Sequence, residues 1–223
     1  MFDKLKNTLK KAIENSANRM TFDPSRFDDP LATQIRWTPI KGGGSNFRTH
    51  KYYSQGANQA GFKATLGAMS FSGIFMLAGL GVSIGVPFGM VQDGEPLVAL
   101  QTLFVIGFGL IFFGVGFYMF RSYSKPVVFD KMVGYFWKGW KKPERYKNNQ
   151  NIEGTIKLSD IHALQIVSEY IRGDKSSYYS YELNIVTREG RRHNVIDHGD
   201  RSDMLADAAK LSDFLGIPVW DAS

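Results

Sequence analysis

Residues 89–98, GMVQDGEPLV, form a short polar stretch between two long segments that carry no charge. No Asp, Glu, Lys or Arg occurs from residue 64 to 92 or from residue 96 to 120. An α-helix rises about 1.5 Å per residue, so about 20 apolar residues cross the hydrocarbon core of a bilayer, which is about 30 Å thick. Both segments exceed that length, and buried helices of a soluble core seldom lack charge throughout. The sequence therefore predicts a membrane protein with a two-helix transmembrane hairpin, whose spans cover about 66–90 and 97–120.

The charges that flank the two predicted spans indicate their orientation. Lys63 precedes the first span, and Arg121 and Lys125 follow the second, whereas the connection carries only Asp93 and Glu95. Short loops rich in Lys and Arg stay on the cytoplasmic side of a membrane. We therefore expect the N and C termini in the cytoplasm and the acidic tip outside, which means the periplasm if the chain is bacterial.

Glycine is frequent in both predicted spans. Gly81, Gly85 and Gly89 recur every four residues and would share one face of the first helix. Small residues let helix backbones approach closely in lipid, where burial of apolar groups provides no driving force. We expect these helix-packing glycines to contact either the second span or a second membrane subunit. Neither span contains an Asp, Glu, Lys, Arg or His side chain, which argues against a transporter or pump that acts alone.

The segments before the first span predict three further elements. Residues 1–20 have the spacing of a basic amphipathic helix, which would lie on an anionic membrane surface or dock on a protein neighbour. Residues 21–46 contain three prolines and a run of three glycines, which predicts an irregular connector. The glycine run lacks the Gly-Lys-Ser/Thr of a phosphate loop. Residues 47–63 predict a juxtamembrane β-hairpin that leads directly into the first span.

Residues 121–223 predict a cytoplasmic β domain that ends in a helix. The clearest strand signal lies in residues 178–197, where apolar and polar side chains alternate on either side of a turn. Residues 202–215 have the apolar spacing of an amphipathic helix, which Asp200 or Ser202 would cap at its N-terminus. A glycine and a proline directly after this segment would end the helix.

The order of these elements predicts an α+β fold class, with a transmembrane hairpin joined to a mostly-β cytoplasmic domain. About seven strands followed by one C-terminal helix is the order of a pleckstrin-homology-like domain, in which the helix closes two bent sheets. In that arrangement residues 47–63 supply the first two strands, and the spans fall between the second and third. The alternative is an α+β domain built only from residues 126–223, with the 47–63 hairpin separate.

The sequence contains no catalytic signature. It has no cysteine, which excludes disulfides, thiolate metal sites and a cysteine nucleophile, and it has no Gly-x-Ser-x-Gly motif of a serine hydrolase. In HNVIDHGD, the residues His193, Asp197 and His198 could bind a divalent metal. The same residues also suit a strand end followed by a helix cap at Asp200. We favour that structural role, and expect no catalytic residue, no metal and no cofactor.

Two clusters are candidate binding surfaces. In RGDKSSYYSYE, the side chains of Tyr178, Tyr179 and Tyr181 would lie on both faces of a strand, and tyrosine is enriched in protein interfaces.

After the second span, basic and tryptophan residues suit the anionic leaflet and the membrane interface. This membrane-surface set is Lys138, Lys141, Lys142, Arg145, Lys147, Trp137 and Trp140. Basic and acidic residues nearly balance over 121–223, so no nucleic-acid partner is expected.

Several segments outside the spans resemble an uncharacterised group of bacterial two-span membrane proteins. The segments are WTPIKGGGSNFRTHK, KPVVFDK, GYFWKG, LSDIHALQIVSEYIRG, SSYYSYELNIVTREGRRHNVIDHG and FLGIPVWD. The resemblance implies a multi-pass protein of the bacterial inner membrane and supplies no catalytic residues. Pleckstrin-homology-like domains beside bacterial transmembrane helices often serve in binding or assembly, and this is an implication of the resemblance alone.

These observations favour a non-catalytic inner-membrane accessory or scaffold protein. Its expected partners are membrane lipids and either a protein partner or further copies of the same chain. The alternative function is a metal-dependent enzyme or regulator that uses His193, Asp197 and His198.

Overall fold

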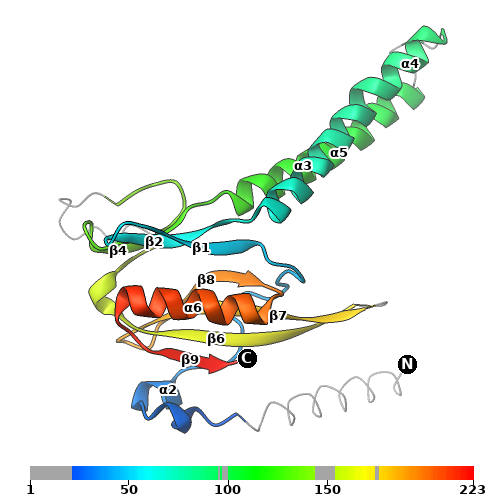
Figure 1. Cartoon of the computed structure of the whole chain (residues 1–223). Coiled ribbons are helices and arrows are strands. Elements are labelled where there is room, and N and C mark those ends of the chain that lie inside the picture. The colour runs from blue at the N-terminus through cyan, green and yellow to red at the C-terminus, as the bar shows by residue number, and fades with distance from the viewer. Residues whose placement is uncertain (1–21, 95, 97–99, 144–153, 174–175) are drawn as a thin grey trace, which may run out of the picture.

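The computed structural model describes residues 22–94, 96, 100–143, 154–173 and 176–223. Figure 1 shows a domain of sheets and one flanking helix, from which a long pair of antiparallel helices projects. The expected α+β class with two apolar helices is confirmed. The amphipathic helix expected over residues 1–20 lies outside the described residues.

The first long helix runs from Leu66 to Gln92, and the second is α5, Leu100–Tyr123. The first is continuous but changes its winding, with α3 (Leu66–Leu80), a π-helical turn η3 (Gly81–Gly85) and α4 (Val86–Gln92). Both helices are long and apolar enough to cross a membrane, and 11% of the most apolar stretch of each is buried. A core helix of a soluble protein would be mostly buried, so these two helices have no such role in the domain.

The two long helices touch through glycines that leave no room for a side chain. A Cβ atom on Gly79 would lie 2.6 Å from the carbonyl oxygen of Gly109, and one on Gly109 would lie 2.7 Å from the carbonyl oxygen of Gly79. A Cβ atom on Gly116 would lie 2.7 Å from the backbone nitrogen of Met76. Ser83 adds a hydrogen bond across this contact, because its hydroxyl donates to a carbonyl of α5 at 3.1 Å.

The three glycines expected to form the packing face of the first span, Gly81, Gly85 and Gly89, lie away from this contact. A Cβ atom on Gly81, Gly85 or Gly89 would meet no atom within 4 Å. The expectation that they pack against the second span is therefore wrong, and the contact is made by the three glycines named above. Two residues along a helix correspond to a rotation of about 200°, so Gly81 points away from α5 while Gly79 faces it.

Sheet A is a five-stranded antiparallel sheet in chain order. Its strands are β1 (His50–Gln55), β2 (Gln59–Ala64), β3 (Val127–Asp130), β4 (Tyr135–Lys138) and β5 (Thr155–Lys157). Strand β2 runs directly into α3 and α5 runs into β3, and these two strands pair with each other. The helix pair is thus inserted between neighbouring strands of one sheet, which contradicts the alternative in which the first hairpin is separate.

Sheet B has the strand order β8-β7-β6-β9. Its strands are β6 (Ile161–Arg172), β7 (Ser177–Thr187), β8 (Arg192–His198) and β9 (Val219–Ala222). Helix α6 (Arg201–Leu215) precedes β9 and is capped by Asp200, whose side chain accepts from the Asp203 backbone. The expectation that this helix is the last element is wrong, because β9 follows it and pairs in parallel with β6.

The main core lies between the two sheets and α6. Strand residues alternate between two faces, and one face of each sheet supplies this core. The largest buried members are Phe62, Val127, Phe129, Phe136, Ile161, Leu164, Ile166, Leu183, Ile185, Ile196, Met204 and Leu211. Leu158–Asp160, the 3-10 turn η4, connects β5 to β6 and so links the sheets.

The segment before β1 covers the other face of sheet B. It contains the 3-10 turn η2 (Pro24–Phe27) and the short helix α2 (Pro30–Gln34), each capped by an aspartate. A second, smaller core forms where this segment meets the sheet, with Ala32, Ala163, Val186 and Trp220 buried and Phe27, Leu31, Ile35 and Trp37 packed against them. The connector expected over 21–46 is therefore a packed layer of the domain over its described residues.

Candidate functional site

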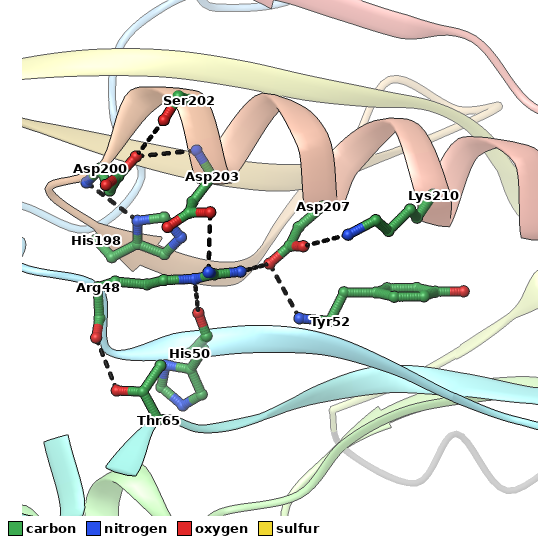
Figure 2. A network of polar contacts seen from close by, with 10 residues as sticks. All are labelled: Arg48, His50, Tyr52, Thr65, His198, Asp200, Ser202, Asp203, Asp207 and Lys210. Carbon is green, nitrogen blue, oxygen red and sulfur yellow. Dashed lines mark hydrogen bonds and ion pairs between the residues drawn. The ribbon is translucent and has the colours of Figure 1, made fainter. Parts of the chain in front are cut away.

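The candidate site is the polar junction where the helix pair meets the domain. We use the name junction for residues 45–50 and the side chains that contact them. This segment joins the layer on sheet B to strand β1, and its contacts reach both long helices and α6. Figure 2 shows the contacts with Thr65, before α3, and with α6. Three groups of interactions build the junction.

The first group fixes the start of α3. Thr65 is the N-cap of this helix, and its hydroxyl accepts from the Ala68 backbone nitrogen at 3.2 Å. The same hydroxyl donates to the carbonyl oxygen of Arg48 at 2.8 Å, and the Thr65 backbone nitrogen donates to the carbonyl of Thr49 at 2.9 Å. A cap residue normally satisfies one free backbone N–H of its helix. Here it also ties the helix to the junction.

The second group fixes the end of α5. The ring of His50 hydrogen-bonds to the backbone of Tyr123, the last residue of α5, and the two rings meet edge to face with centroids 6.3 Å apart. Burial and the nearby Lys138 ammonium lower the pKa of His50 to about 4, so this side chain is neutral at pH 7. Residues 48–50 therefore contact the ends of both long helices that lie at the domain.

The third group connects the junction to α6. The guanidinium of Arg48 lies 2.8 Å from a carboxylate oxygen of Asp203 and 2.6 Å from one of Asp207. Asp207 is buried, and it also accepts from the backbone nitrogen of Tyr52 at 3.0 Å and lies 3.4 Å from the ammonium of Lys210. Hydrogen bonds between charged partners are roughly twice as strong as neutral ones. Figure 2 shows Arg48 between strand β1 and the helix.

The histidines and aspartate proposed as metal ligands are not brought together. His198 is fully buried, and its Nδ1 accepts from the backbone nitrogen of Asp200 at 3.2 Å. Burial lowers its pKa, and the charge of Arg48 adds to that effect. Asp197 lies 4.0 Å from Lys41. Within the described ranges no group of three or more His, Cys, Asp or Glu side chains could hold a metal ion.

The predicted membrane-surface set is divided by the structure. Trp137 is buried, and the ammonium of Lys138 donates to Asn194 and to the carbonyl of Val195 on strand β8, at 3.0 and 2.9 Å. Lys138 keeps an exposed stem, but desolvation of its ammonium lowers its pKa to about 8. These two residues therefore do not form a membrane-facing surface. Neighbouring residues of a strand point to opposite faces. Lys138 shares the face of Phe136, which packs in the main core, and so points toward β8, whereas Trp137 lies on the other face of β4.

The remaining described members of that set lie apart from one another. Trp140 is exposed, and the guanidinium of Arg121 lies over its ring at 5.2 Å from the centroid. Lys141 is exposed, and the ammonium of Lys142 lies 3.8 Å from Asp130. Arg145 and Lys147 lie outside the described residues. Trp140 and Arg121 thus mark the level at which α5 leaves the domain.

The three candidate tyrosines do not form one patch. The hydroxyl of Tyr178 donates to the carbonyl of Gly44 at 3.0 Å, on the face covered by the connector. Tyr181 lies on the opposite face and packs against the main core. Tyr179 is exposed and its ring contacts that of Tyr170, with centroids 5.1 Å apart.

Sequence reasoning missed the polar contacts beneath the connector. The buried carboxylate of Glu182 accepts from the backbone nitrogens of Ile40 and Lys41, both at 2.8 Å, and from Asn184 at 2.7 Å. Arg192 donates to the carbonyl of Thr38 at 2.8 Å. In the sequence these polar residues alternate with apolar ones, which is the pattern of a strand whose polar face is exposed to solvent. The only available signal was the glycine run, which suits close packing of a backbone against a sheet.

Comparisons with known proteins add no further constraint. No family model, no curated protein and no solved structure matches the chain.

Proposed function

We propose that this chain is a non-catalytic accessory or scaffold protein of the bacterial inner membrane, which holds a cytoplasmic binding domain in a fixed orientation at the bilayer. The observation that carries the proposal is the insertion of two exposed apolar helices between paired strands β2 and β3. A flexible linker would let the domain rotate freely. Here the junction binds the inner end of each helix, so the domain and the helix pair move together.

The exposed surface of the helix pair supports membrane insertion. Large apolar side chains on both helices are open, including Leu77 at 71%, Phe104 at 71% and Ile111 at 64%. Soluble monomers rarely expose contiguous apolar patches above a few hundred Å². Arg121 and Trp140 at the inner end of α5 suit a membrane interface, where tryptophan is enriched. The resemblance to bacterial two-span proteins agrees with this location.

The domain architecture supports a binding role. Helix α6 packs against both sheets, as the helix of a pleckstrin-homology-like domain does. Among the described residues, eight strands before the helix and β9 after it depart from the seven-strand pattern. We therefore propose that the domain resembles a pleckstrin-homology-like domain in the way its helix packs on its sheets. We also propose that its ligand is a protein partner or anionic lipid.

The proposed orientation predicts the result of cysteine labelling. The chain has no cysteine, so Asp93→Cys and Ser223→Cys each provide a single reactive thiol. We expect an impermeant thiol reagent to label position 93 in intact spheroplasts and position 223 only after lysis, because the basic flanks stay in the cytoplasm. The parent chain, which has no thiol, is the control for background labelling. The reverse pattern would contradict the orientation.

The scaffold proposal predicts a stable complex in the membrane. Crosslinking in intact membranes, followed by extraction in mild detergent and mass spectrometry, should recover one partner protein or a second copy of the chain at near-stoichiometric yield. An unrelated two-span protein at the same expression level is the control. Recovery of monomer alone, or of stoichiometric metal that is lost in a His198→Ala variant, would contradict the proposal.

A further inference from the structure

We propose that the end of the β6–β7 hairpin makes a second contact with the bilayer surface, through the paired rings of Tyr170 and Tyr179. The inference rests on the proposed insertion of the helix pair. Its consequence is that the domain has two separate supports on the membrane, which fixes its tilt.

The end of this hairpin extends beyond the rest of sheet B. Strand β8 pairs with β7 only as far as Tyr181, and β9 pairs with β6 only as far as Val167. Strands β6 and β7 continue to pair with each other up to Arg172 and Ser177. This outer part of the hairpin, residues 168–173 and 176–180, therefore has no neighbouring strand within the described residues.

The two exposed rings lie on the face that points toward sheet A. Tyr170 and Tyr179 are directly opposite each other in the register, and they are 46% and 53% exposed. Residues two apart on a strand share a face, so Tyr179 shares its face with Tyr181 and Leu183, which pack in the core beneath sheet A. Both long helices leave the domain from sheet A. The exposed rings thus face the membrane side of the domain.

Side-chain contacts place the base of this outer part of the hairpin beside the helix pair. The hydroxyl of Tyr178 donates to the carbonyl of Gly44. The next residue, Ser45, hydrogen-bonds to the side chain of Tyr123 at the end of α5. Two residues further on, Phe47 contacts Phe71 within α3, with ring centroids 5.9 Å apart. The segment 44–47 thus runs from the hairpin to both helices.

The direction of the outer part of the hairpin agrees with these contacts. In Figure 1 the yellow β6–β7 hairpin extends past the domain on the same side as the projecting helix pair. The carboxylate of Glu169 accepts from the Gly43 backbone nitrogen at 3.0 Å. This bond attaches the outer part of the hairpin to the connector.

Lipid fits this surface better than a protein partner does. Tyrosine has an apolar ring and a polar hydroxyl, and it is enriched at membrane–water interfaces. Arg172 lies beside the rings, is exposed, and can approach anionic headgroups. Trp140 and Arg121, at the end of α5, form the other interfacial contact.

The experiment uses the full chain with single cysteines that carry an environment-sensitive fluorophore. Ser177→Cys reports on the hairpin and leaves both tyrosines in place. Gln34→Cys, exposed on α2 on the far face of sheet B, is the negative control. Leu110→Cys, 53% exposed on α5, reports on insertion. The vesicles contain phosphatidylcholine and phosphatidylglycerol with a spin label on the headgroup or in the acyl chain.

We expect headgroup quenching of the label at position 177 and none at position 34. Replacing both rings, Tyr170→Ser with Tyr179→Ser, should reduce quenching at position 177 to the level at position 34, with the far-ultraviolet circular dichroism unchanged. An unquenched label at position 177, or quenching that survives loss of both rings, would overturn the inference. Acyl-chain quenching at position 110 tests the insertion of the helix pair separately from the contact of the hairpin. Its absence would overturn the proposed insertion, whatever the result at position 177.

Discussion

Gly109→Leu should force the two long helices apart, whereas Gly85→Leu should leave the pair intact. At Gly109 a single Cβ atom would already lie 2.7 Å from two backbone atoms of the first helix. Backbone atoms cannot turn aside as a flexible side chain can. Overpacking of a tight contact costs about 1–3 kcal/mol and occasionally more, and we expect the upper end here because Gly79 offers no side chain that could move.

Thermal unfolding in mild detergent measures this difference. The free energy of unfolding should fall by about 3 kcal/mol for Gly109→Leu, and by less than about 0.5 kcal/mol for Gly85→Leu, a residue whose added Cβ meets no atom. The two variants carry the same change in the same hairpin, so each controls for added bulk in the membrane. Equal loss in both variants would show that the helix contact differs from the one described. Weaker self-association of Gly85→Leu alone would identify its face as an oligomer contact.

The two long apolar helices and most strands could be predicted because their signals are local. Two charge-free segments determine the helix pair, and alternation in residues 178–197 determines strands β7 and β8. The helix after Asp200 was predicted from its cap and its apolar spacing. Each of these signals depends on a few neighbouring residues, so no tertiary contact was needed to find it.

The helix contact was misassigned because two glycine patterns compete in the same segment. Gly81, Gly85 and Gly89 repeat every four residues, whereas Gly109 and Gly116 are seven apart, as are Ser72 and Gly79. A spacing of seven keeps residues on one seam of a left-handed helix pair. Small residues in membrane helices can serve either arrangement. Only the position of the partner helix decides between them.

The side chains at the surface of the sheets could not be assigned because alternation defines two faces without showing what covers each. Alternation places Glu182 on the polar face of its strand, a pattern typical of a solvent-exposed face, but the connector lies on that face and its backbone donates to the carboxylate. Lys138 was expected at the membrane, but sheet B lies opposite it. Strand β9 was missed because four residues provide little periodicity. Its place beside β6 is determined by the burial of Trp220.

Arg48→Met should be the most destabilising change in the junction. The substitution removes the guanidinium that lies 2.6 Å from the buried carboxylate of Asp207, and it leaves that charge with only the Tyr52 backbone and the more distant Lys210. Removing one partner of a buried ion pair costs about 3–5 kcal/mol, because the other charge stays buried without compensation. Arg48 also bonds Asp203, so the substitution frees the first half of α6 from strand β1.

The surface pair of Arg191 and Glu189 provides a matched control. Their side chains are 70% and 72% exposed and lie 2.7 Å apart, and exposed pairs contribute about 0–1 kcal/mol. Arg191→Met should therefore change the free energy of unfolding far less than Arg48→Met. Adding Asp207→Leu to Arg48→Met should recover part of the loss, since the uncompensated charge is then gone. A loss for Arg48→Met as small as that for Arg191→Met would mean that the junction does not hold α6. The domain would then be connected to the two long helices by its strands alone.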